Sequence, residues 1–252
     1  MTSIGTIIFL LVGGVAGGLL SSVASMASLA SYPVLLAVGI PPVYANVTND
    51  AALIWTSIGS TISSTKELKG HWKQVGFFSI FTVLGSIIGC SLLLSFPSNV
   101  FEKVVPIFIA FSGIMVLVTG KHHSLTPKKR ANWQRILYII ALLGMGAYTG
   151  YFGAAGGVIV LVLLTYITND RFIVINAIKN MITGLANLVA LIIFAFTSHI
   201  YWLQAIPLAI GMFIGGYIGP IILRHVSAKI IRIFIACLAF FQAGYFFYKA
   251  YL

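Results

Sequence analysis

Acidic residues are scarce in this chain of 252 residues. Asp and Glu together number four, whereas Lys and Arg number fifteen. The four acids are widely spaced along the sequence: Asp50, Glu67, Glu102 and Asp170. General acid–base catalysis needs paired carboxylates, and clusters of carboxylates hold Ca²⁺ or Mg²⁺. The scarcity therefore argues against most enzymes, and we expect no catalytic residue, no metal site and no cofactor.

Cysteine is equally rare. Cys90 and Cys237 lie inside apolar stretches, and neither has Cys or His neighbours at the spacing of a metal site or a redox motif. Both are interpreted as small packing residues. The sequence also has no Walker-type phosphate loop and no HExxH motif, so ATP-driven pumping and zinc-dependent hydrolysis find no support.

Charge of either sign is low. Charged residues make up 8% of the chain, hydrophobic residues 60%, and the mean hydropathy is +1.05. A soluble domain carries about 25% charged residues, so this chain is expected to lie in a lipid bilayer. A spanning helix takes about 20 residues, which leaves room for about 8 to 10 crossings.

Ten apolar segments fall into two groups of five, one on each side of the hydrophilic stretch 121–135. Two of them, 29–40 and 157–167, follow runs of small residues and are too short to span a bilayer, which predicts half-helices or re-entrant elements. The ten segments are 4–22, 29–40, 45–65, 75–96, 104–119, 136–152, 157–167, 172–197, 203–223 and 230–248.

An internal repeat appears when the two halves are aligned at an offset of 129 to 131 residues. The alignment places Ala24 with Gly153, Asn49 with Asn180, Trp72 with Trp202, Gly85 and Gly89 with Gly215 and Gly219, and Lys103 with Arg232. We therefore predict a first transmembrane repeat over 1–120, a cytoplasmic linker over 121–135 and a second transmembrane repeat over 136–252.

The basic residues predict the orientation, because short loops rich in Lys and Arg stay in the cytoplasm. Twelve fall on one side if every segment crosses: Lys66, Lys69, Lys73, Lys121, Lys128, Lys129, Arg130, Arg135, Arg171, Arg224, Lys229 and Arg232. Lys103 and Lys249 fall on the other. Equivalent loops of the two halves then face opposite sides, so the fold class is an all-α polytopic membrane protein with two inverted-topology repeats. The basic excess is explained by topology and by anionic membrane lipid, without nucleic acid.

The two breaks before the short segments form one candidate substrate site. Half-helix N-termini offer unpaired N–H groups to an anion. The break in the first half contributes Ser25 and Ser28, and the break in the second half contributes Gly153, Gly156 and Gly157. The alternative interpretation is that these small residues only pack helices against each other.

A polar cluster near the start of the third segment of each half is the second candidate. The first half has Thr48, Asn49 and Asp50, and the second half has Lys179, Asn180, Thr183 and Asn187. An ammonium inside a membrane segment is expensive unless it is paired, so Lys179 is the strongest candidate to attract an anion, unless its side chain reaches the interface instead. Asp50 fits a carboxylate stabilised at a helix N-terminus, with proton coupling as the alternative.

Several of these stretches resemble the sulfite exporter TauE/SafE family. They are residues 33–36, the 39–42 turn, 45–49, the basic 66–73 loop, and Lys179-Asn180 with Asn187, and the resemblance covers Ile4 to Tyr248. It implies a multi-pass permease of the prokaryotic inner membrane that moves small sulfur-containing anions, usually outward. One departure is the stretch 24–28, where the family commonly has a glycine-rich run.

The sequence therefore predicts a secondary transporter, an exporter of a small anion such as sulfite, a sulfonate or sulfoacetate, that works by alternating access around a midplane site. An anion channel, or a membrane-embedded enzyme or accessory subunit of sulfur metabolism, are the alternatives. The identity of the anion, the direction, the coupling ion and the oligomeric state stay open.

Overall fold

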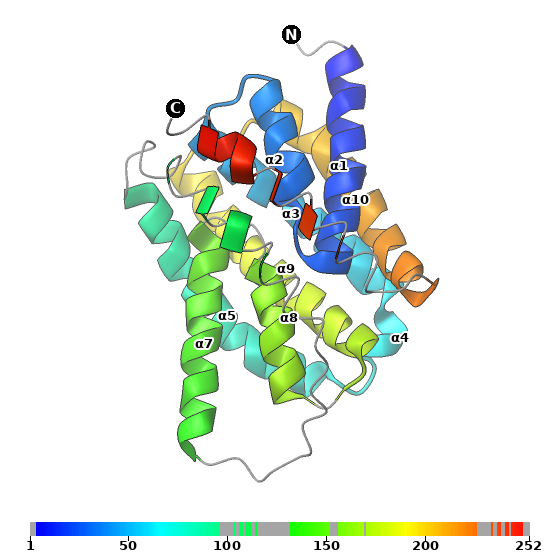
Figure 1. Cartoon of the computed structure of the whole chain (residues 1–252), viewed down its shortest axis with the longest axis vertical. Coiled ribbons are helices and arrows are strands. Elements are labelled where there is room, and N and C mark those ends of the chain that lie inside the picture. The colour runs from blue at the N-terminus through cyan, green and yellow to red at the C-terminus, as the bar shows by residue number, and fades with distance from the viewer. Residues whose placement is uncertain are drawn as a thin grey trace.

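The computed structural model describes residues 4–95, 132–151, 156–168 and 170–225, with single positions and short stretches between 103 and 114 and between 233 and 248. Its described part is helical throughout (Figure 1). The helices are α1 (Ile4–Ala24), α2 (Ser28–Ala37), α3 (Pro42–Ser63), α4 (Thr65–Leu68), α5 (Trp72–Ser95), α7 (Asn132–Tyr151), α8 (Gly156–Ile167), α9 (Phe172–Thr197) and α10 (Trp202–His225).

The described helices confirm a polytopic membrane protein. Four of them, α1, α5, α9 and α10, are long and apolar enough to cross a membrane. Helix α3 has 22 residues, enough for about 33 Å, but it carries more polar side chains than the other long helices. The expected segment 104–119 lies mostly outside the described residues, 230–248 lies partly outside them, and the linker is not described up to residue 131. Helix α7 begins at Asn132, four residues before its expected start.

The two short segments are short helices in the structure, as predicted. Helix α2 has 10 residues and α8 has 12, or about 15 and 18 Å, roughly half of a bilayer core. Figure 1 shows α2 running back toward the end where α1 began, and α8 running back toward the end where α7 began. In that view α1 runs downward and α7 runs upward, so the two breaks meet at mid-height from opposite directions.

The first and last long helices of each half pack against helices of the other half. Helix α1 packs along α10, and α5 packs along α7. Glycines bring the backbones into contact at both interfaces: Gly14 and Gly18 lie against α10, and Gly85 and Gly89 lie against α7. In a bilayer such close van der Waals contact, rather than water exclusion, holds helices together.

Helices α3 and α9 cross at the centre of the molecule. The buried apolar side chains form two clusters, one around α2 and α3 that includes Leu35, Val47 and Phe194, and one around α8 and α9 that includes Leu164 and Ile178. Large apolar side chains are also exposed along the outer helices, as expected for lipid contact.

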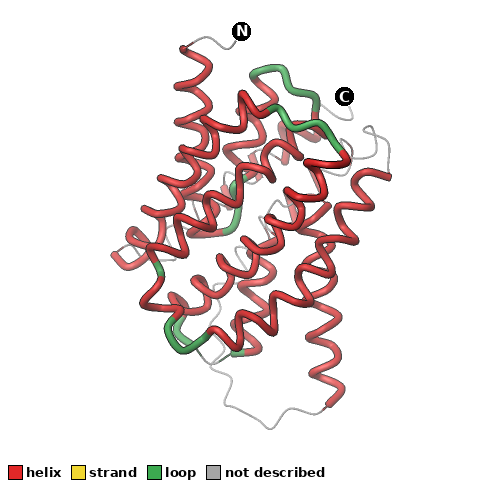
Figure 2. Tube along the Cα trace, turned by 180° about the vertical axis from the view of Figure 1, so that it is seen from behind, coloured by secondary structure: helices red, strands yellow, loops and turns green. Residues whose placement is uncertain are grey.

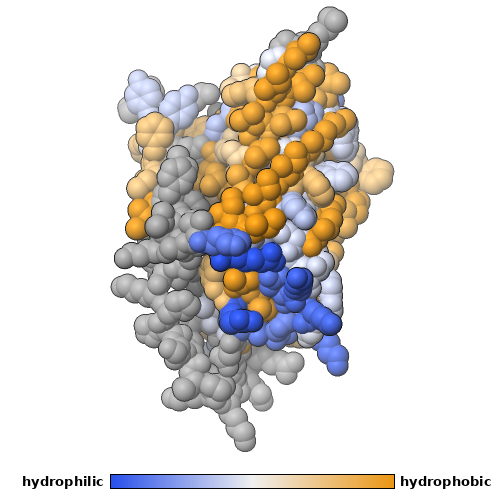
Figure 3. Space-filling model, turned by 90° about the vertical axis from the view of Figure 1, so that its right-hand side faces the viewer, coloured by the Kyte–Doolittle hydropathy of each residue, from blue (hydrophilic) through white to orange (hydrophobic). Residues whose placement is uncertain are grey.

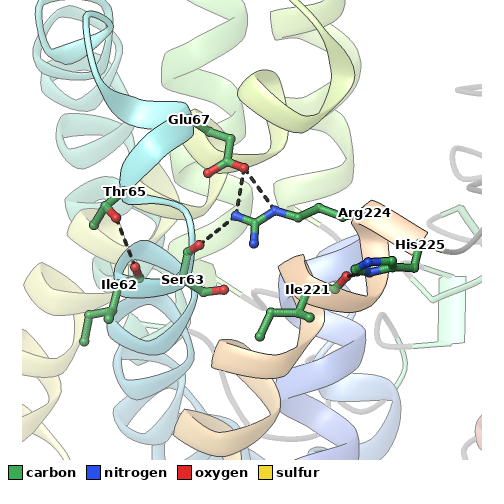
Figure 4. Close-up of polar contacts among 7 residues, drawn as sticks. All are labelled: Ile62, Ser63, Thr65, Glu67, Ile221, Arg224 and His225. Atoms are coloured by element: carbon green, nitrogen blue, oxygen red, sulfur yellow. Dashed lines mark hydrogen bonds and ion pairs between the residues drawn. The ribbon is translucent and has the colours of Figure 1, made fainter.

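Apart from the turn between α1 and α2, which lies inside the bundle, most of the described loops lie at its two ends (Figure 2). At one end Arg224 of α10 forms an ion pair with Glu67 of α4 at 2.8 Å and donates to the Ser63 carbonyl at 2.9 Å (Figure 4). His71 and Asp170 meet at 3.8 Å and join the two neighbouring loops. On the face in Figure 3, hydrophilic side chains gather toward the lower end and apolar ones cover the part above.

The other end is closed by aromatic side chains. Tyr44 near the start of α3 contacts His199 and Tyr201 in the α9–α10 loop, with ring centroids 6.2 Å apart in both pairs. The Tyr201 N–H donates to the Thr48 hydroxyl at 3.2 Å. The α2–α3 and α9–α10 loops therefore meet at one end, while the α3–α5 and α8–α9 loops meet at the other.

Gly89→Ala is expected to destabilise the protein. A Cβ at Gly89 would overlap the Ala147 carbonyl, whereas a Cβ at Gly76 on the same helix meets nothing within 4 Å. Overpacking of this kind costs about 1–3 kcal/mol. Gly89→Ala should therefore lower the unfolding temperature of the detergent-solubilised protein by several degrees, and Gly76→Ala should not. Equal unfolding temperatures would contradict the close α5–α7 packing.

Candidate functional site

Helix α1 ends in a strained turn. Ser25 has φ +61°, and among the described residues it alone, glycines apart, has a positive φ. Its N–H donates to the Ser21 carbonyl at 2.7 Å, and the Met26 N–H donates to the Leu20 carbonyl at 3.2 Å. Such left-handed helix ends usually have Gly, because a side chain there costs about 1–2 kcal/mol. The surrounding structure must therefore hold Ser25 in place.

Side chains of helix α9 hold Ser25 and the end of α1 in place. Asn176 and Asn180 donate their side-chain N–H groups to the Ser22 carbonyl, at 2.9 and 3.2 Å. The Lys179 ammonium donates to the Ser21 carbonyl at 3.3 Å and to the Ser25 hydroxyl at 2.5 Å. The spacing of 176, 179 and 180 places all three on one face of α9. This face caps the carbonyl end of α1, the negative end of its dipole.

Lys179 is fully buried, with 0% of its surface exposed. The interpretation that its side chain reaches the membrane interface is therefore wrong. Among the described residues no carboxylate pairs with it, because the two ion pairs there join His71 to Asp170 and Arg224 to Glu67. The ammonium is thus balanced by neutral oxygen atoms alone, which leaves its charge uncompensated.

The N-terminus of α8 reaches the same place. A Cβ built on Gly157 would lie 2.5 Å from Cβ of Ser25, 2.6 Å from its Oγ and 3.4 Å from Cδ of Lys179. Glycine is therefore required for this close approach. This approach brings the positive end of the 12-residue helix α8 next to the Lys179 ammonium. The helix N-terminus and the ammonium therefore both lie beside Ser25.

A small cavity adjoins this point. Its volume is about 20 Å³, room for about one water molecule. Polar groups dominate its lining, and Leu53 of α3 is the largest apolar side chain among them. The lining residues are Ser21, Ser25, Ala27, Leu53, Thr149, Gly157, Thr183 and Asn187.

The structure brings five of the predicted site residues together: Ser25, Gly157, Lys179, Thr183 and Asn187. Asn180 lies beside them and caps α1. Gly156 begins α8, and Gly153 lies outside the described residues. Thr183 donates its hydroxyl hydrogen to the Lys179 carbonyl at 2.9 Å, so it could donate to a ligand only if this bond broke.

Three predicted residues, Ser28, Thr48 and Asn49, have hydrogen-bond partners elsewhere in the structure. Asn49 donates to the Ser28 hydroxyl at 3.2 Å and accepts from Ser31 at 2.5 Å, so it ties the start of α2 to α3. Thr48 accepts from the Tyr201 N–H. None of the three lines the cavity, and their part in substrate binding stays a prediction.

Three cavity or capping residues were absent from the predicted site. Asn176 carried a signal, since it lies three residues before Lys179 and so on the same helical face. Ser21 and Thr149 carried none, because each is an ordinary polar residue near the end of an apolar helix. Only the packing of α1 and α7 around the breaks reveals them.

Asp50 is the ninth residue of α3, which begins at Pro42. The interpretation of Asp50 as a carboxylate at a helix N-terminus is therefore wrong, because the dipole acts mainly within the first turn. The side chain is 1% exposed, and only the Asn46 amide donates to it, at 3.5 Å. In the part of the chain that the structure describes, no group of three His, Cys, Asp or Glu residues could hold a metal ion.

Comparison with known proteins decides the family. The family described as "Sulfite exporter TauE/SafE" matches residues 9–246 of this chain. The chain belongs to the TauE/SafE family. No solved structure matches it.

Curated relatives of this TauE/SafE protein are named as transporters. A "Probable membrane transporter protein" of Haemophilus influenzae is 21% identical over 231 residues, 92% of this chain and 90% of the relative. "Probable membrane transporter protein YfcA" of Escherichia coli K12 is 23% identical over 85% of this chain and 80% of the relative. "Probable membrane transporter protein YunE" of Bacillus subtilis is 23% identical over 76% of each. The TauE/SafE protein is thus a membrane transporter of the permease type.

Gly157→Ala is expected to impair transport by the TauE/SafE protein without unfolding it. The new methyl group would displace the Ser25 hydroxyl from the Lys179 ammonium. Gly144→Ala on α7 is the matched control, because a Cβ there meets nothing within 4 Å. Flux in proteoliposomes should fall about tenfold for Gly157→Ala, a change of about 1.4 kcal/mol, and stay unchanged for Gly144→Ala. Wild-type flux in both variants would remove the α8 N-terminus from the site.

Proposed function

We propose that this protein is a secondary transporter of a small sulfur-containing anion such as sulfite or a sulfonate. The anion binds at the Lys179 ammonium, between the end of α1 and the start of α8. The observation that carries this proposal is the fully buried ammonium with no carboxylate partner among the described residues. The family match to sulfite exporters supports the sulfur-containing class of substrate.

Electrostatics favours an anion at this site. A buried charge that lacks a partner costs several kcal/mol, and the Ser21 carbonyl and the Ser25 hydroxyl offset only part of that cost. An oxyanion beside Lys179 would supply the missing countercharge. It would also accept hydrogen bonds from the first N–H groups of α8 and from the Ser25 hydroxyl.

The arrangement of the helices supports alternating access. The breaks after α1 and α7 meet near the middle of the molecule from opposite directions (Figure 1), as inverted repeats place them in other transporters. Each end of the bundle is held by its own contacts, the Glu67–Arg224 ion pair at one and the Tyr44–Tyr201 contact at the other. The cavity of about 20 Å³ is too small for a sulfur oxyanion, so the helices must separate for the anion to enter.

Lys179→Gln is expected to abolish this transport while the protein stays folded. Glutamine keeps a donor for the Ser21 carbonyl but removes the charge that attracts the anion. Uptake of sulfite and of methanesulfonate into proteoliposomes should fall at least about tenfold. Lys69→Gln, which removes an exposed lysine at the end of the bundle, is the control and should keep wild-type uptake. Persisting uptake in folded Lys179→Gln would exclude Lys179 from the mechanism.

We also propose that the protein lies in the prokaryotic inner membrane with its basic end in the cytoplasm. The α3–α5 loop with Lys66 and Lys69, Arg171 and the end of α10 meet at one end of the bundle, and Lys- and Arg-rich loops stay inside.

A labelling experiment tests this orientation. In a variant without Cys90 and Cys237, His199→Cys should react with a membrane-impermeant maleimide added to intact spheroplasts, because the α9–α10 loop faces outward. Lys69→Cys should react only after the membrane is permeabilised. The reverse pattern would invert the orientation and leave the transport proposal unaffected.

A further inference from the structure

Asp50 is a buried acid without an adequate partner. Its Oδ2 accepts one long hydrogen bond of 3.5 Å from the Asn46 amide, and its Oδ1 has no partner within the described residues. The Asn46 amide is shared with the Tyr151 carbonyl at the end of α7, also at 3.5 Å. Among the described residues no other hydrogen bond stabilises a negative charge on Asp50, so the ionised form depends on the more distant charge of Lys179.

The helices around Asp50 bring no cation to it in the described part of the chain. Helix α3 packs against α1, α2, α9 and α10. Helix α1 has no titratable side chain, and the Lys179 ammonium of α9 is bonded to Ser21 and Ser25 instead. Cys90 of α5 lies within electrostatic range of Asp50. The other titratable side chains of these elements are Tyr32 of α2, Tyr44 of α3, Lys73 of α5, and Tyr217, Arg224 and His225 of α10, and within the described residues no hydrogen bond or ion pair joins any of them to Asp50.

The second half of the chain shows what a neutral side chain does at the equivalent place. Asn46 and Asn176 make equivalent contacts. The Asn46 amide donates to the Tyr151 carbonyl at the end of α7, and the Asn176 amide donates to the Ser22 carbonyl near the end of α1. The match of Asn46 with Asn176 sets an offset of 130 residues, which pairs Asp50, in place of the Asn49 of the sequence alignment, with Asn180, whose amide donates to the Ser22 carbonyl. A protonated carboxyl group can donate such a hydrogen bond, and a carboxylate cannot.

Asp50 is also close to the anion site. Leu53, one helical turn further along α3, lines the cavity together with Ser25 and Thr183. In a medium of low dielectric constant, Lys179 and a charged Asp50 together carry no net charge. A bound monovalent anion would leave an excess negative charge in the core, and a proton on Asp50 would remove it.

We infer that Asp50 binds a proton when the site at Lys179 binds its anion, so that a proton crosses the membrane with each monovalent anion. The proton comes from the water on the side where the anion enters, sits on the Asp50 carboxyl group and leaves with the anion. This inference rests on the proposed function, because it requires an anion at Lys179. The two gradients together then set the direction of transport.

Proteoliposomes loaded with a pH indicator test the coupling. Methanesulfonate is the main probe, because a sulfonate stays ionised and carries no proton itself; sulfite is the second, with passive entry subtracted from protein-free liposomes. With the membrane potential clamped, an inward anion gradient should acidify the interior in the wild type. Asp50→Asn should break the link, so that any remaining anion uptake occurs without acidification.

Two further variants make the result specific. Asp50→Glu keeps a titratable carboxyl group and should keep the acidification, which also tests whether a loss in Asp50→Asn is merely misfolding. Glu67→Gln removes an acid at the end of the bundle and should keep wild-type coupling. Anion uptake without acidification in the wild type would overturn the coupling and leave the transport proposal standing. Acidification that persists in Asp50→Asn would remove Asp50 from it, and absence of any Lys179-dependent uptake would count against the transport proposal itself.

Discussion

The uncompensated ammonium of Lys179 is the constraint on which the rest of the centre depends. A cation can stay in the core of a membrane protein only if oxygen atoms surround it, and the open carbonyl end of a broken helix offers them. The break after α1, the left-handed Ser25 and the row of three donors on α9 are therefore parts of one arrangement. Because its partners are neutral, the arrangement stays electrostatically incomplete, and that incompleteness suits it to a charged ligand.

The two central helices differ in charge but resemble each other in design. Helix α9 carries a base and α3 carries an acid at neighbouring positions of the alignment, and each helix has an asparagine directed at the end of a helix of the opposite half. The two central helices thus supply two separate ionisable groups within one core. Substrate and coupling ion would then occupy corresponding places in the two halves and would influence each other through charge rather than through direct contact.

The sequence predicts the helical class from the length of the apolar segments and the short helices from the interruptions between them. It singles out Lys179 because this residue is a charge inside an apolar segment. It could not separate Asn49 and Ser28, which bond to each other, from Thr183 and Asn187, which line the cavity, because all four are small polar residues in similar stretches. It placed Asp50 near a helix start because the apolar run begins at residue 45. Helix α3 already begins at Pro42, so Asp50 lies in its third turn. Which polar groups are already satisfied depends on packing between segments more than a hundred residues apart.

The packing of α1 and α5 against helices of the other half of the chain has a consequence for biosynthesis. Helix α1 is made first, yet the glycine-lined surface along which it packs belongs to α10, near the end of the chain. Until α10 is inserted, the surface of α1 that packs against it is in contact with lipid. The surface of α5 that packs against α7 is likewise uncovered until α7 is inserted. Neither group of helices can therefore complete its packing alone, and α1 can pack in its final position only after α10 has been inserted.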